Sequence, residues 1–185
     1  CADFPPMRSV IWSHISGLFK PYIHPGLIEQ VQKFVFSSEA SRAAPMLEQL
    51  SAEDKAKIQV INSGFGFTDN VQHVHTTRKK PLIGYLGTVN FVKMHPGFFD
   101  AIDALTDDVD VSIWGVADPS VVNYAKSKKH ADRFTFHGET ASPASAIAGC
   151  DIFFYPLAEE HYGTGENALV EAMSLGVPVL VLNNP

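Results

Sequence analysis

The sequence has few cysteines, few charged residues and no long apolar run. Cys1 and Cys150 are the only cysteines among its 185 residues, too few for a disulfide framework. Charged residues make up 18% and hydrophobic residues 45%, which is typical of a globular domain and not of a disordered chain. No apolar stretch approaches the roughly 20 residues of a membrane-spanning helix. The sequence therefore indicates a folded protein of the reducing cytoplasm, in which Cys150 is a small core residue.

The chain is acidic, with a formal net charge of −6 at pH 7, which argues against a nucleic-acid partner. Its basic clusters, Arg78–Lys80 and Lys126–Lys129, are short and typical of solvated surfaces. A few aromatic residues expected at the surface are compatible with peripheral membrane association of a parent protein, although no basic amphipathic helix is evident. We expect such a longer parent because Cys1 is not a natural start.

The first part of the chain, residues 1–68, predicts short strands that alternate with helices. Pro25 suits the first turn of a helix, whereas Pro45 weakens the middle of the second predicted helix. The predicted elements are strands at Arg8–Ser13, Phe34–Ser37 and Ile58–Ile61, with helices at Pro25–Lys33 and Ser38–Leu50. Residues 69–80 are polar and aperiodic, and they therefore predict a connector.

From Pro81 onward the pattern becomes regular. The predicted strands are Leu82–Leu86, Val109–Trp114, Phe134–Phe136, Asp151–Tyr155 and Pro178–Leu182. The predicted helices are Pro96–Leu105, Pro119–His130, Pro143–Gly149 and Glu166–Leu175. Strands that alternate with helices of about ten residues indicate βαβ units, a parallel sheet and right-handed crossovers. The fold class expected is α/β, with a Rossmann-like parallel sheet covered by helices on both faces.

A Gly-rich loop at Pro156–Gly165 joins a predicted strand to a predicted helix. Open α/β sheets bind ligands at the carboxyl ends of their strands, and the free N–H groups of a first helical turn suit a phosphate. The expected phosphate donors are the N–H groups of Gly163, Thr164, Gly165, Glu166 and Asn167. Carboxylates beside them can hold sugar hydroxyls, so the segment predicts a nucleotide-sugar site. An ordinary turn and helix cap is the alternative.

Other loops follow strands of the same predicted sheet. Thr88 can donate its hydroxyl to a phosphate, with a helix cap as the alternative. Gly115 and Gly138 end two strands, where a missing side chain lets a ligand approach the backbone closely. We expect the nucleotide base near Phe136–Gly138, with plain strand-end turns as the alternative.

The segment GENALVEAMSLGVPVLV resembles the donor-binding segment of GT-B-type retaining glycosyltransferases of family 4. Those enzymes typically show E-x7-E followed by A-M-x-x-G-x-P-V. The second half matches at Glu171, Ala172, Met173, Gly176, Pro178 and Val179. The resemblance implies that Glu171 binds the ribose hydroxyls of the nucleotide. The first half departs, because Gly163 stands eight positions before Glu171. Glu160, in a run similar to the family's E-x-F-G, is the expected first Glu, with Glu166 as the alternative.

The resemblance extends over most of the chain. VINSGF, LIGYLGTVNFVKMHPGFFDAIDAL, VDVSIWG and RFTFHG are similar to successive segments of the family. It implies that residues 1–68 are the tail of an N-terminal Rossmann-like domain. Residues 81–185 would then be a nucleotide-sugar-binding C-terminal domain that is incomplete at its end.

The resemblance also assigns roles to single residues. Where the family has G-R, this chain has Gly87-Thr88, so the arginine is missing. Lys93 follows in the same loop, and the resemblance implies that it pairs with the diphosphate oxygens. A histidine after an N-terminal-domain strand contacts the donor sugar in the family, which implies that role for His14. Glu160 would touch the sugar or stabilise its developing positive charge.

The expected function is transfer of a hexose-type sugar from a nucleotide-sugar donor to an acceptor hydroxyl, with retention. The acceptor would be a sugar, glycan or lipid-linked molecule. No cofactor is expected beyond the donor substrate itself, and no metal ion is required in this family. The histidines His73, His75 and His161 lack the spacing of a zinc site.

Two other functions compete with this interpretation. A non-catalytic nucleotide-sugar-binding module would explain the missing arginine and the shifted first Glu. A dinucleotide-binding Rossmann domain would need G-x-G-x-x-G after its first strand. Gly64–Gly66 and Gly163–Gly165 are each only G-x-G.

Overall fold

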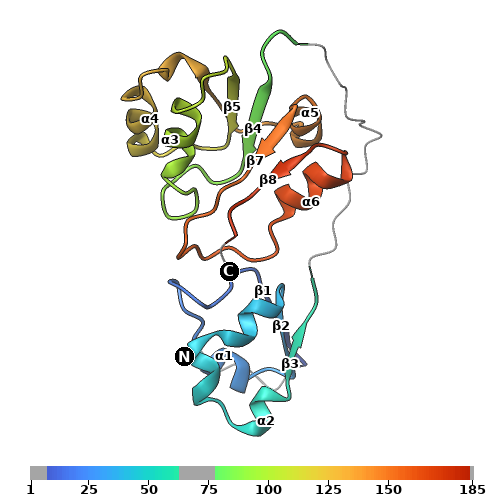
Figure 1. The fold of residues 1–185 in the computed structure, drawn as a ribbon. Coiled ribbons are helices and arrows are strands. Elements are labelled where there is room, and N and C mark those ends of the chain that lie inside the picture. The colour runs from blue at the N-terminus through green and yellow to red at the C-terminus, as the bar shows by residue number, and fades with distance from the viewer. Residues whose placement is uncertain (1–7, 63–77, 184–185) are drawn as a thin grey trace. The chain divides into compact units, whose positions relative to one another are not determined.

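The computed structural model describes residues 8–62 and 78–183, which form two compact units (Figure 1). The N-terminal unit comprises residues 8–62 together with 160–166, and the C-terminal unit comprises residues 78–159 and 167–183. Most of the predicted connector, residues 69–77, lies outside the described residues. The loop 160–166 leaves the C-terminal unit after one of its strands and returns to it at a helix, while packing with the N-terminal unit.

The N-terminal unit contains a parallel sheet in the order β1-β2-β3. Its elements are β1 (Val10–Ser13), α1 (Gly26–Glu29), β2 (Lys33–Phe36), the 3-10 helices Glu39–Ala43 and Pro45–Gln49, α2 (Ala52–Lys55) and β3 (Ile58–Val60). Ile28, Phe34 and Phe36 are fully buried in its core. All three predicted strands are present, and the helix predicted from Pro25 is shorter, because strand β2 already starts at Lys33.

The single helix predicted over Ser38–Leu50 is wrong. The chain forms two 3-10 helices there, separated by Ala44, whose backbone is extended (φ −60°, ψ 126°). Pro45 disfavours the α conformation of the residue before it, so a helix cannot continue through Ala44. Helix α2, which begins where Ser51 caps the backbone N–H of Asp54, was not predicted.

The C-terminal unit is a parallel sheet in the order β6-β5-β4-β7-β8. Its strands are β4 (Leu82–Leu86), β5 (Asp110–Trp114), β6 (Phe134–Gly138), β7 (Ile152–Phe154) and β8 (Val179–Leu180). Its helices are α3 (Gly97–Asp103), α4 (Pro119–Lys126), α5 (Pro143–Ala148) and α6 (Asn167–Ser174), with a 3-10 turn at Ala131–Arg133. Helices α3 and α4 lie on one face and α5 and α6 on the other (Figure 1). The predicted α/β, Rossmann-like class is confirmed.

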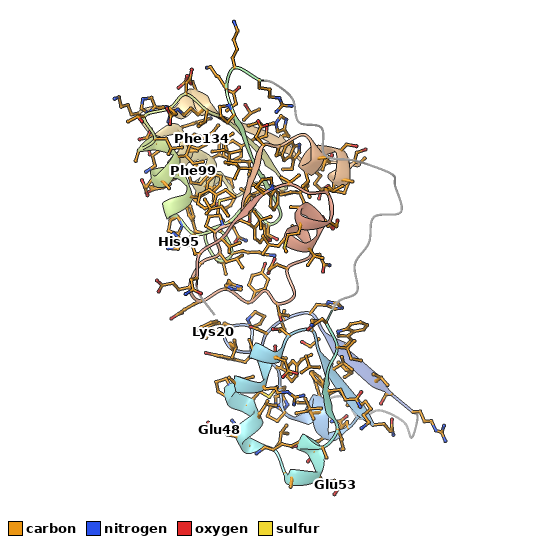
Figure 2. All side chains as sticks on the ribbon, turned by 45° about the vertical axis from the view of Figure 1, so that its right-hand side comes forward. Lys20, Glu48, Glu53, His95, Phe99 and Phe134 are labelled. Atoms are coloured by element: carbon orange, nitrogen blue, oxygen red, sulfur yellow. The ribbon has the colours of Figure 1, made fainter. Side chains whose placement is uncertain are left out.

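Aromatic side chains fill the core between the sheet and helix α3. Phe98 and Phe99 are fully buried, and the ring of Phe99 meets that of Phe134 edge-on with centroids 5.1 Å apart (Figure 2). The buried guanidinium of Arg133 donates to the carbonyl of Ile102 in α3 (2.8 Å) and to that of Asp107 beyond the end of the helix (3.0 Å). These bonds tie the guanidinium to the carboxyl end of the helix and to the loop that follows it. The polar cap and the aromatic core together fix α3 against the sheet.

The thiol of Cys150 is fully buried at the start of β7, and burial raises its pKa to about 12. It donates to the carbonyl of Ala146 at 3.3 Å. We expect no alkylation of Cys150 by iodoacetamide in the folded protein at pH 8, where roughly one such thiol in ten thousand is ionised. A Cys1→Ser variant leaves Cys150 as the one reactive thiol, and mass spectrometry compares its alkylation in the native chain and in guanidinium. Rapid labelling of the native chain would contradict this burial.

Candidate donor-binding site

The chain reverses direction across the sheet at β4, whose neighbours β5 and β7 are reached by crossovers on opposite faces. Such a switch point is where open α/β sheets bind ligands. The loops that follow β4 and β7 pair there in antiparallel fashion at Met94 and Leu157. The N–H of His95 donates to the carbonyl of Pro156 (2.9 Å), and the N–H of Ala158 donates to the carbonyl of Lys93 (2.8 Å). The two loops therefore form one built surface at the carboxyl end of the sheet.

The loop after β4 places Gly87 and Thr88 at this edge. The N–H of Gly87 donates to the carbonyl of Trp114 at 3.1 Å, and a Cβ on Gly87 would lie 3.1 Å from the Tyr155 hydroxyl. The carbonyl of Thr88 accepts from the Tyr85 hydroxyl at 2.8 Å, and Thr88 itself is exposed. The backbone is thus fixed, while Thr88 remains exposed, which a phosphate contact requires.

Lys93 follows in the same loop. It is half-buried, and its Nζ lies 6.0 Å from the centroid of the Tyr155 ring, at the outer range of a cation–π interaction. Tyr155 directly follows β7, so the side chain of Lys93 reaches across the switch point. The sequence predicted Lys93 as a site residue but missed Tyr155. The available signal was its position as the last residue of the predicted strand Asp151–Tyr155.

The ends of β5 and β6 meet at two glycines. The N–H of Gly115 donates to the carbonyl of Gly138 at 2.7 Å. Gly138 has a φ of +70°, and no atom would come within 4 Å of a Cβ placed on it. Its conformation favours glycine, as in a strand-end turn, and the open space beside it is what the predicted approach of a ligand needs. Both interpretations of Gly138 are therefore compatible with its geometry.

Helix α6 begins at Asn167, which is exposed, and contains Glu171 in its second turn. Ala172 and Leu175 point into the core and fix the rotation of the helix. Glu171 is half-buried, and burial raises the pKa of its carboxyl. A carboxylate held in this way gains from hydrogen-bond donors that replace its lost water.

The remaining predicted residues belong to the N-terminal unit. In the loop 160–166, Gly163 pairs in antiparallel fashion with Ile15, and the N–H of Ser16 donates to the carbonyl of Tyr162 at 3.0 Å. Gly163 is buried, and the carboxylate of Glu166 occupies the space that a side chain at Gly163 would need.

The polar side chains of this unit differ in exposure. The buried hydroxyl oxygen of Thr164 has no hydrogen-bond partner among the described residues. Glu160 and Gly165 are exposed. His14 is also exposed, and its ring stacks on that of Trp12 with centroids 5.6 Å apart. The predicted donor-contacting residues are thus divided between the two units, with Gly87, Thr88, Lys93, Gly138, Asn167 and Glu171 in the C-terminal one.

Within residues 8–62 and 78–183, no three His, Cys, Asp or Glu side chains gather in a way that could hold a metal ion. His73, His75 and the motif Gly64–Gly66 lie outside the described residues. None of the described helices has the length and apolar character needed to cross a membrane.

A sequence model of the family described as glycosyl transferases group 1 matches residues 80–185, which is more than half of the chain. The chain belongs to this family. The match covers both loops of the switch point and the whole of α6, and therefore every candidate residue of the C-terminal unit. A search of curated proteins finds no significant match.

Solved structures with the same fold include several glycosyltransferases. Anabaena HepE in complex with UDP-glucose has a TM-score of 0.73 at 17% identity, covering 96% of this chain and 54% of HepE. A variant of S. aureus TarM in complex with UDP has a TM-score of 0.73 at 13% identity, covering 96% and 37%. The lipopolysaccharide outer core galactosyltransferase WaaB has a TM-score of 0.62 at 20% identity, covering 83% and 43%.

This group 1 glycosyltransferase chain spans about half, or less, of the length of these proteins. At such low identity the likeness shows the fold, which is the GT-B type expected from the sequence. The roles of individual residues rest on their own geometry and chemistry.

Proposed function

We propose that this glycosyltransferase binds a nucleotide-sugar and transfers a hexose-type sugar to an acceptor hydroxyl with retention of configuration. The observation that carries the proposal is the switch point of the C-terminal unit, where the paired loops after β4 and β7 present Lys93. The half-buried carboxylate of Glu171 belongs to the same unit. A cationic and a carboxylate group are what a diphosphate and a ribose require.

Lys93 would stabilise the negative charge that develops on the leaving diphosphate, the largest electrostatic demand of the reaction. The backbone N–H groups of Gly163–Asn167 and the hydroxyl of Thr88 would contribute donors to the same phosphates. These donors would stabilise the diphosphate without a metal ion, and we propose that the reaction is metal-independent. No cofactor takes part beyond the donor substrate.

Glu171 would accept hydrogen bonds from the ribose hydroxyls, and Gly138 would lie beside the base. Glu160 and His14 would act on the transferred sugar, by stabilising its positive charge and by orienting it. A sugar, glycan or lipid-linked molecule would be the acceptor. We propose that this chemistry takes place in the cytoplasm, because a chain with so few cysteines is typical of a reducing compartment.

The relatives suggest the first ligand to use. HepE is described in complex with UDP-glucose and TarM in complex with UDP. Calorimetric titration of this chain with UDP, GDP and ADP therefore starts with UDP, with and without EDTA. We expect one diphosphate to bind, with an affinity that EDTA leaves unchanged. A folded chain that binds none of the three would contradict the proposal.

A Lys93→Ala variant is expected to bind that diphosphate roughly tenfold more weakly, because it loses a charged hydrogen-bond partner. Binding of the corresponding nucleoside, which has no phosphate, should stay unchanged. Lys126→Ala is the matched control, since it removes the same charge from an exposed position in α4 of the same unit. Equal losses in the two variants would indicate a general effect of charge and would remove Lys93 from the site.

A further inference from the structure

The turn that contains Lys93 is closed by the side chain of Asn90. The carboxamide Oδ1 of Asn90 accepts from the N–H of Val92 at 3.1 Å and from the N–H of Lys93 at 3.0 Å. The backbone carbonyl of Asn90 also accepts from Lys93 (3.2 Å) and from Met94 (2.8 Å). Asparagine is favoured in such turns because its short side chain reaches the backbone two and three residues ahead.

Both ends of this turn are anchored by β-bridges to neighbouring loops. At its start the fully buried Val89 pairs with Ala117, and its carbonyl accepts from the N–H of Asp118 at 2.9 Å. At its end, Met94 pairs with Leu157 in the loop after β7. Between these anchors the Asn90 carboxamide closes the turn over residues 90–93.

The far end of Lys93 also meets a rigid surface. Its Nζ lies over the ring of Tyr155, which is fully buried and stacks on the ring of Tyr85 with centroids 5.0 Å apart. On another side Tyr155 stacks on Phe153, with centroids 5.8 Å apart. The Lys93 backbone is thus fixed by Asn90, and its ammonium group faces a buried aromatic ring at the outer range of a cation–π interaction.

We propose that Asn90 is a positioning residue for the donor diphosphate, acting by fixing the turn from which Lys93 reaches the phosphates. A lysine that is ordered before the ligand arrives loses less conformational freedom on binding, so its charge contributes more to affinity. The inference rests on the proposed function, because it requires that Lys93 meets a diphosphate. It adds a residue whose contribution passes entirely through Lys93.

The test compares Asn90→Ala with Asn90→Ser in calorimetric titrations. The ligands are the tightest-binding of UDP, GDP and ADP and its parent nucleoside. We expect Asn90→Ala to weaken diphosphate binding about threefold to fivefold and to leave nucleoside binding unchanged. Asn90→Ser keeps a hydroxyl that can accept from the same N–H groups and should recover part of the loss. Circular dichroism and thermal unfolding confirm that both variants are folded.

A double-mutant cycle decides whether Asn90 acts through Lys93. In a Lys93→Ala background, Asn90→Ala should have no further effect on diphosphate binding. An equal loss in both backgrounds, or an equal loss for the nucleoside, would overturn the positioning role. Unchanged diphosphate binding by Asn90→Ala would do the same while leaving the proposed function intact. Failure of the wild-type chain to bind any of the three diphosphates would instead remove the proposed function, and this inference with it.

Discussion

Replacing Gly115 with alanine is expected to destabilise the C-terminal unit by about 2–5 kcal/mol. Gly115 directly follows β5 and has a φ of +130°, a conformation that residues with side chains rarely adopt. A Cβ there would overlap the backbone carbonyl oxygen of Gly87 and lie 3.1 Å from the side chain of Val89. A backbone oxygen cannot move aside without moving β4, so the ends of β4 and β5 would have to separate.

Gly176→Ala supplies the comparison for this effect. Gly176 follows α6 with a φ of +76°, but a Cβ on it would meet no atom within 4 Å. It should therefore show only the conformational cost of about 1–2 kcal/mol. Urea unfolding of both variants, followed by circular dichroism, measures the difference. If the two substitutions cost the same, steric overlap with Gly87 contributes nothing, and the ends of β4 and β5 lie further apart than described.

The alternation of strands and helices could be predicted from the sequence because each element reflects its own local pattern. All eight strands of the described residues were predicted within a few positions, and the order of the C-terminal helices was predicted as well. The failure at Ser38–Leu50 has a local cause: Pro45 was weighed as a weak point inside a helix. Its effect on the residue before it, Ala44, ends the first 3-10 helix.

The candidate site shows the limit of local patterns more clearly. Lys93 and Glu171 were predicted because each stands in a segment that resembles a known family. Tyr155 was missed although it ends a predicted strand, because its contact with Lys93 joins segments about sixty residues apart. Asn90 was missed although its signal was local. An asparagine commonly accepts hydrogen bonds from the N–H groups two and three residues ahead, here those of Val92 and Lys93. The ligand roles of all these residues stay predictions.

The second large effect is expected at Glu171. A Glu171→Ala variant should bind the nucleoside diphosphate about 1.5–3 kcal/mol more weakly, the contribution of hydrogen bonds to a charged group. The physical reason is that ribose hydroxyls can satisfy a carboxylate that burial has partly deprived of water. Calorimetry with the diphosphate and with the nucleoside reads the result. Both ligands contain ribose, so both should lose affinity, unlike the pattern expected for Lys93→Ala.

The direction of the pKa shift gives this prediction a second, independent readout. Burial raises the pKa of Glu171, so the folded chain disfavours the ionised carboxylate. The protonated group contributes favourably to the free energy of unfolding. This contribution is complete below the ordinary glutamate pKa of about 4.3 and is lost as the pH rises through the raised pKa. Glu171→Gln, which never ionises, should therefore match the wild type in stability at acidic pH and exceed it slightly at neutral pH.

Glu171→Gln thus separates the two consequences of one buried carboxylate. At neutral pH it should bind the ligand more weakly while unfolding at a slightly higher urea concentration. Wild-type affinity should fall as the pH drops through the raised pKa, because the ribose hydroxyls need an ionised acceptor, and that dependence should vanish in the variant.

Glu53→Gln is the control, since Glu53 is an exposed glutamate in α2 of the N-terminal unit (Figure 2). A Glu171→Gln variant that binds as the wild type does, with the same pH dependence, would place Glu171 outside the donor site. If that variant were nevertheless more stable than the wild type at neutral pH, the raised pKa of Glu171 would reflect burial only and no role in binding.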